Sequence, residues 1–192
     1  MADLTTAAKV LGCLPAGTPM PADSFATQIA AASAMVRRFC NRDFDSIERT
    51  EIHDAGPQEF GVNEWPVSSI ASFTFVDDTA STELVADTDY RLDARIGLIR
   101  LASKPRQVWR NLEVRYVGGY ATIPADLDFA TALIAAALWE QAQRSGSLAG
   151  VKREKLGAYE YELLPSSERG IGKDGIPDSA RGILVQYRRT VI

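Results

Sequence analysis

The spacing of apolar residues changes twice along the chain, and these changes limit the folds open to it. Up to about residue 44, apolar side chains recur every three or four residues, as an α-helix requires. From about residue 46 to 119 they alternate in short runs separated by turn residues, which is typical of β-strands. Helical spacing then returns at about residue 123. The pattern predicts an α+β fold, with helices at both ends in sequence and a β-rich segment between them.

The N-terminal part predicts two helices. A short helix covers "LTTAAKVLGCLP", where Gly12 and Pro15 would stop it. A longer helix covers "PADSFATQIAAASAMVRRFCNR", with Asp23 or Ser24 as its N-cap. The apolar stripe of the longer helix consists of Phe25, Ile29, Ala32, Val36 and Phe39.

The middle part predicts a small antiparallel sheet or sandwich. Its strand-like runs are "SIERTEIH", "QEFGV", "SSIASFTFVD", "TDYRLD", "GLIRL" and "NLEVRYVGGY". A third helix follows in "IPADLDFATALIAAALWEQAQRSGS". Pro124 suits its first turn, Asp126 and Asp128 suit the positive end of its dipole, and Gly146 is expected just past its end.

We expect four segments in the chain. Residues 1–45 would hold the N-terminal helices of a small bundle, and 46–121 the β-rich insertion. Residues 122–165 would hold the long helix and a short extended segment. Residues 166–192 would form a flexible Gly- and Ser-rich loop and a last helix at about 179–189.

Composition excludes several classes of protein. A net charge of -4 and a pI near 5.1 argue against a protein that coats DNA, because such affinity comes from Lys and Arg against phosphates. No apolar run reaches the roughly 20 residues of a membrane-spanning helix. The first residues lack the basic region of a signal peptide. Cys13 and Cys40 stand among apolar neighbours, so we expect buried thiols and a reducing compartment.

Residues for catalysis and metal binding are scarce. The lone histidine, His53, precedes Asp54 in a strand-like run, where consecutive side chains point to opposite faces. No nucleophile elbow, CxxC pair or HExxH motif occurs, and the segment "RGIGKDG" lacks the preceding strand of a phosphate loop. The acids of "FVDDTASTELVADTDYRLD" do not have EF-hand spacing and are expected in solvated hairpin loops. The sequence predicts no enzyme, no cofactor and no metal site.

The stretch "AASAMVRRFCNRDF" gathers Arg37, Arg38 and Arg42 at one helix end. These arginines fit a grip on nucleic acid, part of a catalytic site, a surface that docks on protein, or a solvated helix end that favours cations. No RRM, zinc-finger or helix-turn-helix signature accompanies them. We expect Arg42 to pair with an acid, either Asp43, Asp45 or one further away.

The order of segments resembles the phage head–tail connector (adaptor) proteins. These share a Leu-Thr start and a helix of the pattern I-x-A-A-[ST]-x-x-[VI]-x-x-[FY]-C-x-R-x-F. This chain supplies Ile29, Ala31, Ala32, Ser33, Val36, Phe39, Cys40, Arg42 and Phe44 at those places. The segments "WPVSSIASFTFVD", "LEVRYVGGYATIPADLDFA" and "EKLGAYEYELLP" and the Tyr-Arg-Arg end continue the resemblance over about residues 4–189.

The resemblance implies a structural virion protein at the head–tail junction, made in the cytoplasm of a bacterial host. Connectors of this family form a ring, commonly twelve-fold, that joins the portal to head-closure (stopper) or tail-terminator proteins, and DNA passes through the ring without sequence-specific binding. The candidate residues for contact with a neighbouring subunit or the portal are Arg37, Arg38, Ile183, Leu184, Tyr187, Arg188 and Arg189. The alternative function is a nucleic-acid-binding accessory protein of phage or host.

Overall fold

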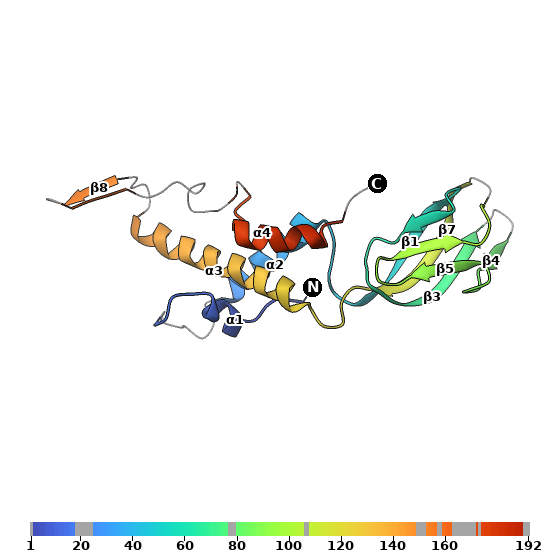
Figure 1. Cartoon of the computed structure of the whole chain (residues 1–192), viewed down its shortest axis with the longest axis horizontal. Helices are drawn as coiled ribbons and strands as arrows, with labels where there is room; N and C mark the ends of the chain where they lie inside the picture. Colours follow the sequence, from blue (N-terminus) through green and yellow to red (C-terminus); the bar gives the residue numbers. More distant parts are fainter. Residues whose placement is uncertain are drawn as a thin grey trace. The chain divides into compact units, whose positions relative to one another are not determined.

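The switch in apolar spacing corresponds to two units of different structure (Figure 1). The computed structural model describes residues 2–17, 25–76, 80–105, 108–148, 153–156, 159–162, 172 and 174–189. Residues Met1–Asn41 and Ile123–Ile192 belong to a helical unit, and Arg42–Thr122 form a β unit. Helices and antiparallel sheets together confirm the predicted α+β class.

The first two helices of the helical unit are α1 (Ala7–Gly12) and α2 (Ala26–Cys40). The predicted stripe of α2 is confirmed: it is buried from Phe25 through Val36, and Phe39 is half-buried. Asn41 ends α2 in the left-handed conformation with φ 52°, which Asn tolerates better than most residues. The expected caps at positions 23 and 24 lie outside the described residues.

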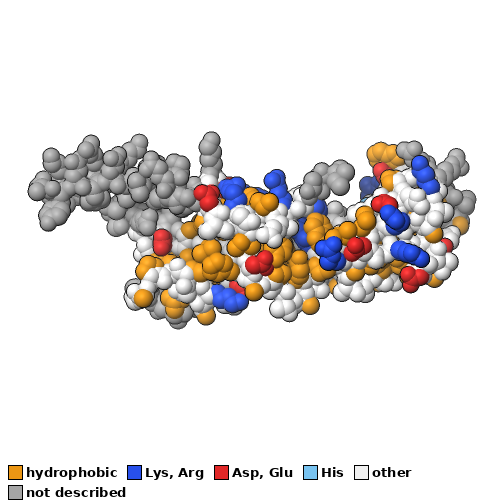
Figure 2. Space-filling model, viewed as in Figure 1, with side chains coloured by type: hydrophobic (Ala, Val, Ile, Leu, Met, Phe, Trp, Pro, Cys, Tyr) orange, Lys and Arg blue, Asp and Glu red, His pale blue; other side chains and the backbone are white. Residues whose placement is uncertain are grey.

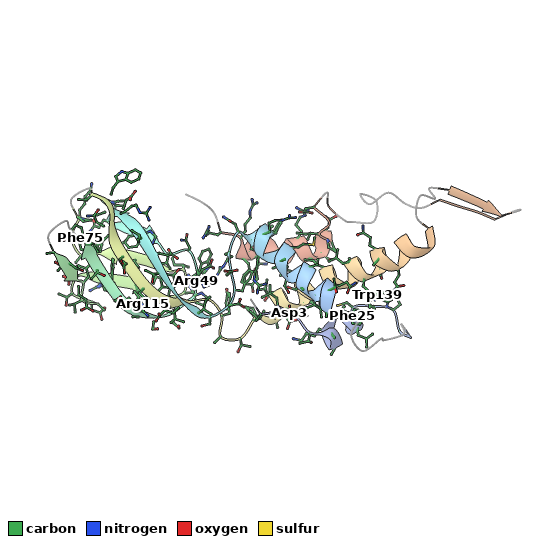
Figure 3. All side chains as sticks on the ribbon, turned by 180° about the vertical axis from the view of Figure 1, so that it is seen from behind. Asp3, Phe25, Arg49, Phe75, Arg115 and Trp139 are labelled. Carbon is green, nitrogen blue, oxygen red and sulfur yellow. The ribbon has the colours of Figure 1, made fainter. Side chains whose placement is uncertain are left out.

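The long helix α3 (Ala125–Leu148) packs against α1, α2 and the last helix, α4 (Asp178–Leu184). Its buried face includes Leu127 and Ile134. The Trp139 ring packs against the ring of Phe25, the residue that precedes α2, and the ring centroids are 5.9 Å apart (Figure 3). The prediction that Gly146 lies past the helix end is wrong, because α3 continues through it to Leu148. A glycine inside a helix costs only about 1 kcal/mol relative to alanine, so it does not by itself end a helix.

The C-terminal part is more structured than expected. Strands β8 (Arg153–Leu156) and β9 (Tyr159–Glu162) form an antiparallel hairpin where one short extended segment was predicted. The last helix is α4 (Asp178–Leu184), followed by the 3-10 turn η1 (Val185–Tyr187). Most of the expected flexible loop, up to residue 171, lies outside the described residues.

The six predicted strands of the β unit are present. They are β1 (Ile47–Ala55), β2 (Glu59–Gly61), β3 (Val67–Val76), β5 (Tyr90–Asp93), β6 (Leu98–Leu101) and β7 (Val108–Gly118). An additional short strand, β4 (Ser81–Glu83), was not predicted. One sheet has the order β1-β7-β3-β4 and another the order β2-β6-β5, and all the paired strands are antiparallel.

The core of the β unit draws side chains from both sheets. Phe73 of β3 and Tyr90 of β5 meet edge to face, with ring centroids 4.9 Å apart. Leu112, Val114 and Tyr116 of β7 are buried in the same cluster. Side chains of both sheets therefore share one apolar layer, as in a sandwich.

The two ends of the β unit meet at Gly119. Its φ is 110°, and a Cβ atom there would lie 2.3 Å from the Asp45 carbonyl oxygen. The Tyr120 N–H donates to the Phe44 carbonyl at 2.8 Å, and the Gly119 N–H donates to the Pro66 carbonyl at 3.0 Å. Only glycine allows this close approach of the two chain segments.

Candidate assembly interface

The C-terminal end of α2 carries two of the predicted interface residues. Arg37 and Arg38 occupy the last turn, where cations interact favourably with the helix dipole. Arg37 is half-buried, and its Nη2 donates to the Ala2 carbonyl at 2.5 Å. Arg38 is exposed. Arg37 therefore holds the N-terminal segment, while Arg38 presents its charge to solvent.

The end of the chain returns to the same place. The Arg189 N–H donates to the Cys40 carbonyl at 2.8 Å, and the Cys40 Sγ lies 3.6 Å from the Leu184 carbonyl. The Arg188 guanidinium lies 5.8 Å from the centre of the Phe39 ring. The structure thus brings the two predicted groups, residues 37–38 and 183–189, together at the end of α2.

The predicted residues of the C-terminal group have different surroundings. Leu184 is fully buried, so it belongs to the core of the helical unit and its side chain is not available to a partner. Ile183 and Tyr187 are half-buried, and the Tyr187 hydroxyl donates to Asp126 Oδ1 at 2.6 Å. Arg188 is exposed and Arg189 is half-buried. The exposed member of this predicted group, Arg188, is basic, which favours contact with an acidic surface.

Arg181 of α4 belongs to this basic group and was not predicted as an interface residue. Its guanidinium lies 5.5 Å from the centre of the Phe39 ring, and its Nη2 lies 2.5 Å from Asp174 Oδ1. A hollow of about 80 Å³ beside it is lined by Met35, Arg38, Phe39, Asp174 and Ile176. Small-molecule sites usually measure about 300–1,000 Å³, so this surface suits protein contact better than ligand binding.

In the β unit, Arg42 has the structural role that the sequence predicted. Its Nε lies 3.5 Å from Glu64 Oε2, and both side chains are almost fully buried. The guanidinium also lies 3.9 Å from the centre of the Trp65 ring and donates to the Trp65 carbonyl. Glu64 is thus an acid further along the chain, one of the alternatives that the sequence left open, and its Oε1 also accepts from the Asp43 N–H at 3.0 Å. Arg42 is therefore committed to protein contacts, as a buried cation must be.

A second buried polar network joins β1 to β7. The Tyr116 hydroxyl donates to Glu51 Oε1 and accepts a hydrogen bond from the Glu64 N–H at 3.1 Å. Burial, then the hydrogen bond and the negative charge of Glu51, raises the pKa of Tyr116 well above its ordinary value. Tyr116 therefore stays protonated at working pH and acts as a donor to the Glu51 carboxylate.

Glu51 also contacts the lone histidine. His53 Nε2 lies 3.0 Å from Glu51 Oε2, and the His53 ring lies 4.7 Å from the Phe60 ring. Burial raises the pKa of Glu51, but hydrogen bonds from His53, Tyr116 and the Asn63 N–H outweigh it and leave the pKa below its ordinary value. Asp54, the neighbour of His53 in sequence, instead accepts from the Arg110 N–H at 2.9 Å. The histidine thus takes part in a structural network, with no nucleophile positioned beside it among the described residues.

The described part of the chain lacks the side-chain clusters of a metal site and the helices of a membrane span. No group of three or more His, Cys, Asp or Glu side chains there could hold a metal ion. Asp77 and Asp78 of the acidic segment, and most of "RGIGKDG", lie outside it. Among the described helices, none is long and apolar enough to cross a membrane.

The chain shares its fold with neck components of gene transfer agent (GTA) particles. A chain from the neck of an empty GTA particle, computed with C6 symmetry, matches with a TM-score of 0.56 at 16% identity, over 96% of this chain and 89% of that one. A chain from the virion of a native GTA particle gives 0.56 at 15% identity, with the same coverage. A chain from the neck of a native GTA particle, computed with C12 symmetry, gives 0.53 at 16% identity, over 96% and 88%. No curated protein sequence matches the chain.

The family model for head completion proteins matches residues 3–148, which include α1, α2, the whole β unit and α3. This match confirms the resemblance to head–tail connectors that the ordered sequence segments indicated. The chain belongs to the head completion protein family, whose members are structural proteins of the head–tail junction of the virion.

Proposed function

We propose that this protein forms a ring beneath the portal and joins the filled capsid to the head-closure or tail-terminator proteins. The proposed ring has twelve subunits, and DNA passes through its lumen without sequence-specific binding. The observation that carries the proposal is the family match over residues 3–148. The likeness of fold to chains in C6- and C12-symmetric necks supports a cyclic assembly.

Charge is consistent with a conduit for DNA. The chain has 25 acidic and 21 basic side chains, counting Asp, Glu, Lys and Arg. A lumen rich in exposed Lys and Arg would hold phosphates and slow the passage of DNA. Arg42, one of the early candidates for a DNA grip, is buried against Glu64 and Trp65 and cannot reach a phosphate.

The basic segment that follows α4 is the proposed contact with the portal. Its exposed basic member is Arg188. A test by deletion of residues 182–192 would also remove Leu184 from the core, so charge reversal is the cleaner perturbation. The variant Arg188→Glu should fold as the wild type and bind portal at least tenfold more weakly. Unchanged portal binding by this variant would move the contact elsewhere.

The test of the function as a whole is electron microscopy of the purified protein mixed with its purified portal. The proposal predicts a ring of density on the portal, coaxial with its channel, with one copy of this chain per repeat. A protein that stays monomeric and does not bind the portal contradicts the proposal. Binding of the protein to duplex DNA with an affinity that falls steeply as the salt concentration rises would instead favour the nucleic-acid-binding alternative.

A further inference from the structure

Helix α3 has an apolar face that no other described element of the helical unit covers. Phe129, Leu133 and Ala137 follow one another at intervals of four residues, so they share one face of the helix. Phe129 is 51% exposed, and Leu133 and Ala137 are half-buried. Figure 2 shows hydrophobic side chains gathered along α3 on the visible face of the helical unit. Contiguous apolar surface of this kind marks a site of protein contact.

The end of the chain borders this apolar face of α3. The hydrogen bond from Tyr187 to Asp126 ties the η1 turn to the first turn of α3, one turn before Phe129. The same turn carries Val185, which is 57% exposed. The helical unit therefore carries a further exposed hydrophobic side chain in the turn that is tied to the start of α3.

Charge indicates what kind of surface would cover this face. Residues 125–143 of α3 contain Asp126, Asp128 and Glu140 but no Lys or Arg. Asp128 is paired with Lys9, while Asp126 is exposed and Glu140 half-buried. An apolar face with an acidic rim requires an apolar partner with a basic rim.

Helix α2 presents such a surface on the same chain. It contains no acidic residue, and it ends in Arg37 and Arg38. Ala30, Ala31 and Ala34 are exposed, and Arg38 follows them one turn later on the same side. Small side chains let another helix approach closely, and Arg38 adds the complementary charge.

The two faces point in opposite directions. Helix α3 lies in front of α2 in Figure 1, whereas α2 lies in front in Figure 3, which is turned by 180°. Since α2 and α3 pack against each other, the exposed side of each is the side away from the other. A subunit therefore carries two different, complementary faces on opposite sides of its helical unit.

We propose that a second copy of this chain covers the apolar face of α3. The Phe129–Leu133–Ala137 face of one subunit seats on the α2 face of the next, with Arg38 directed towards the acidic rim of α3. Such a contact is heterologous, and repetition with a closing rotation gives a ring. This contact rests on the proposed ring function and names the surfaces that build the ring.

The first test compares single substitutions on the two faces. Phe129→Asp places a charge in the α3 face, and Ala34→Glu places an acid in the α2 face. The matched control is Val85→Asp in the β unit, because Val85 is also an exposed apolar residue, at 58%. Each variant is mixed with purified portal, and rings are counted by electron microscopy against wild type.

Each face variant should lower the yield of rings at least tenfold, while Val85→Asp matches the wild type. Since all three residues are exposed, the melting temperatures should agree within a few degrees, which shows that loss of rings is not loss of fold. If either face variant is folded and yields as many rings as the wild type, the proposed contact is wrong. If a face variant is unfolded, Leu133→Gln and Ala31→Gln replace it and are read in the same way.

A mixture of the two face variants tests the head-to-tail arrangement. The Phe129→Asp chain keeps its α2 face, and the Ala34→Glu chain keeps its α3 face, so one contact between the two chains remains possible. Chemical cross-linking followed by mass spectrometry should find dimers that contain one chain of each kind, and no rings. Absence of such mixed dimers, when the wild type cross-links into rings, contradicts the head-to-tail contact.

The failure of this inference can be told from the failure of the proposed function. If both the wild type and the face variants form rings on the portal, the proposed function stands and the proposed contact between subunits is wrong. A wild-type protein that forms no ring on the portal overturns both.

Discussion

The Tyr116 hydroxyl offers a quantitative test of the buried network in the β unit. Tyr116→Phe removes one oxygen and leaves the ring in place, so no cavity of a methyl group or larger forms. The variant loses a hydrogen bond to the Glu51 carboxylate, worth about 1.5–3 kcal/mol when the acceptor is charged. It also removes the acceptor of the Glu64 N–H, a buried donor whose loss of a partner costs about 1–3 kcal/mol. We expect a loss of about 2–4 kcal/mol in the free energy of unfolding.

The assay is urea unfolding of the full chain at pH 7, followed by circular dichroism. Hydrogen exchange of the Glu64 amide reports the network directly, and this amide should exchange at least tenfold faster in Tyr116→Phe. Tyr90→Phe is the matched control, because the Tyr90 ring is also buried but its hydroxyl makes no hydrogen bond among the described residues. It should change stability by less than about 0.5 kcal/mol. Equal stability losses in the two variants would refute the reasoning.

Three further substitutions test the rest of the β unit. Glu51→Gln should destabilise the protein by about 1–3 kcal/mol at pH 7. The pKa of Glu51 is lower in the folded protein than in the unfolded chain, so the stability difference between Glu51→Gln and the wild type should shrink as the pH falls below about 4. A stability difference that grows in acid would contradict the role assigned to Glu51. Arg42→Met should lower the free energy of unfolding by about 3–5 kcal/mol, because it leaves the buried Glu64 carboxylate without its cation. A melting temperature equal to that of the wild type would count against this ion pair. Gly119→Ala should lower the free energy of unfolding by more than about 1 kcal/mol, because the new Cβ would overlap the Asp45 carbonyl. An unchanged midpoint of urea unfolding would show that the backbone accommodates the Cβ and would contradict this prediction.

Elements with a strong period could be predicted from the sequence. The apolar residues of α2 from Phe25 to Val36 repeat every three or four residues, and those of β3 and β7 alternate. Burial of one face of each element causes these periods, so the type of each element could be predicted. Strand β4 could not be predicted in this way, because Ser81–Glu83 has no apolar residue and is exposed throughout. Its pairing with the end of β3 creates the strand.

Helix ends were less predictable than helix centres. Gly146 looked like a stop signal, but α3 continues to Leu148 because a glycine lowers helix stability without breaking the hydrogen-bond pattern. The last helix was expected over residues 179–189. It instead ends at Leu184 and tightens into η1, where the Tyr187 hydroxyl reaches Asp126.

The candidate interface was predictable only in part. A family pattern and a cluster of charges were enough to select Arg38 and Arg188, which are exposed. They could not separate these residues from Leu184, because burial of Leu184 depends on how α4 packs. The face of α3 was not predicted as an interface, because the apolar residues of this helix extend round several sides and the sequence does not show which side is packed. That α1, α2 and α4 pack on α3 and leave Phe129 exposed among the described residues is seen only in the folded structure.

The most direct test of the account is a reconstruction by electron cryomicroscopy of this protein bound to its portal. The account predicts a closed ring, with the α3 face of each subunit against the α2 face of the next and an open channel along the axis. A complex in which this chain binds as isolated copies, or no complex at all, would contradict it.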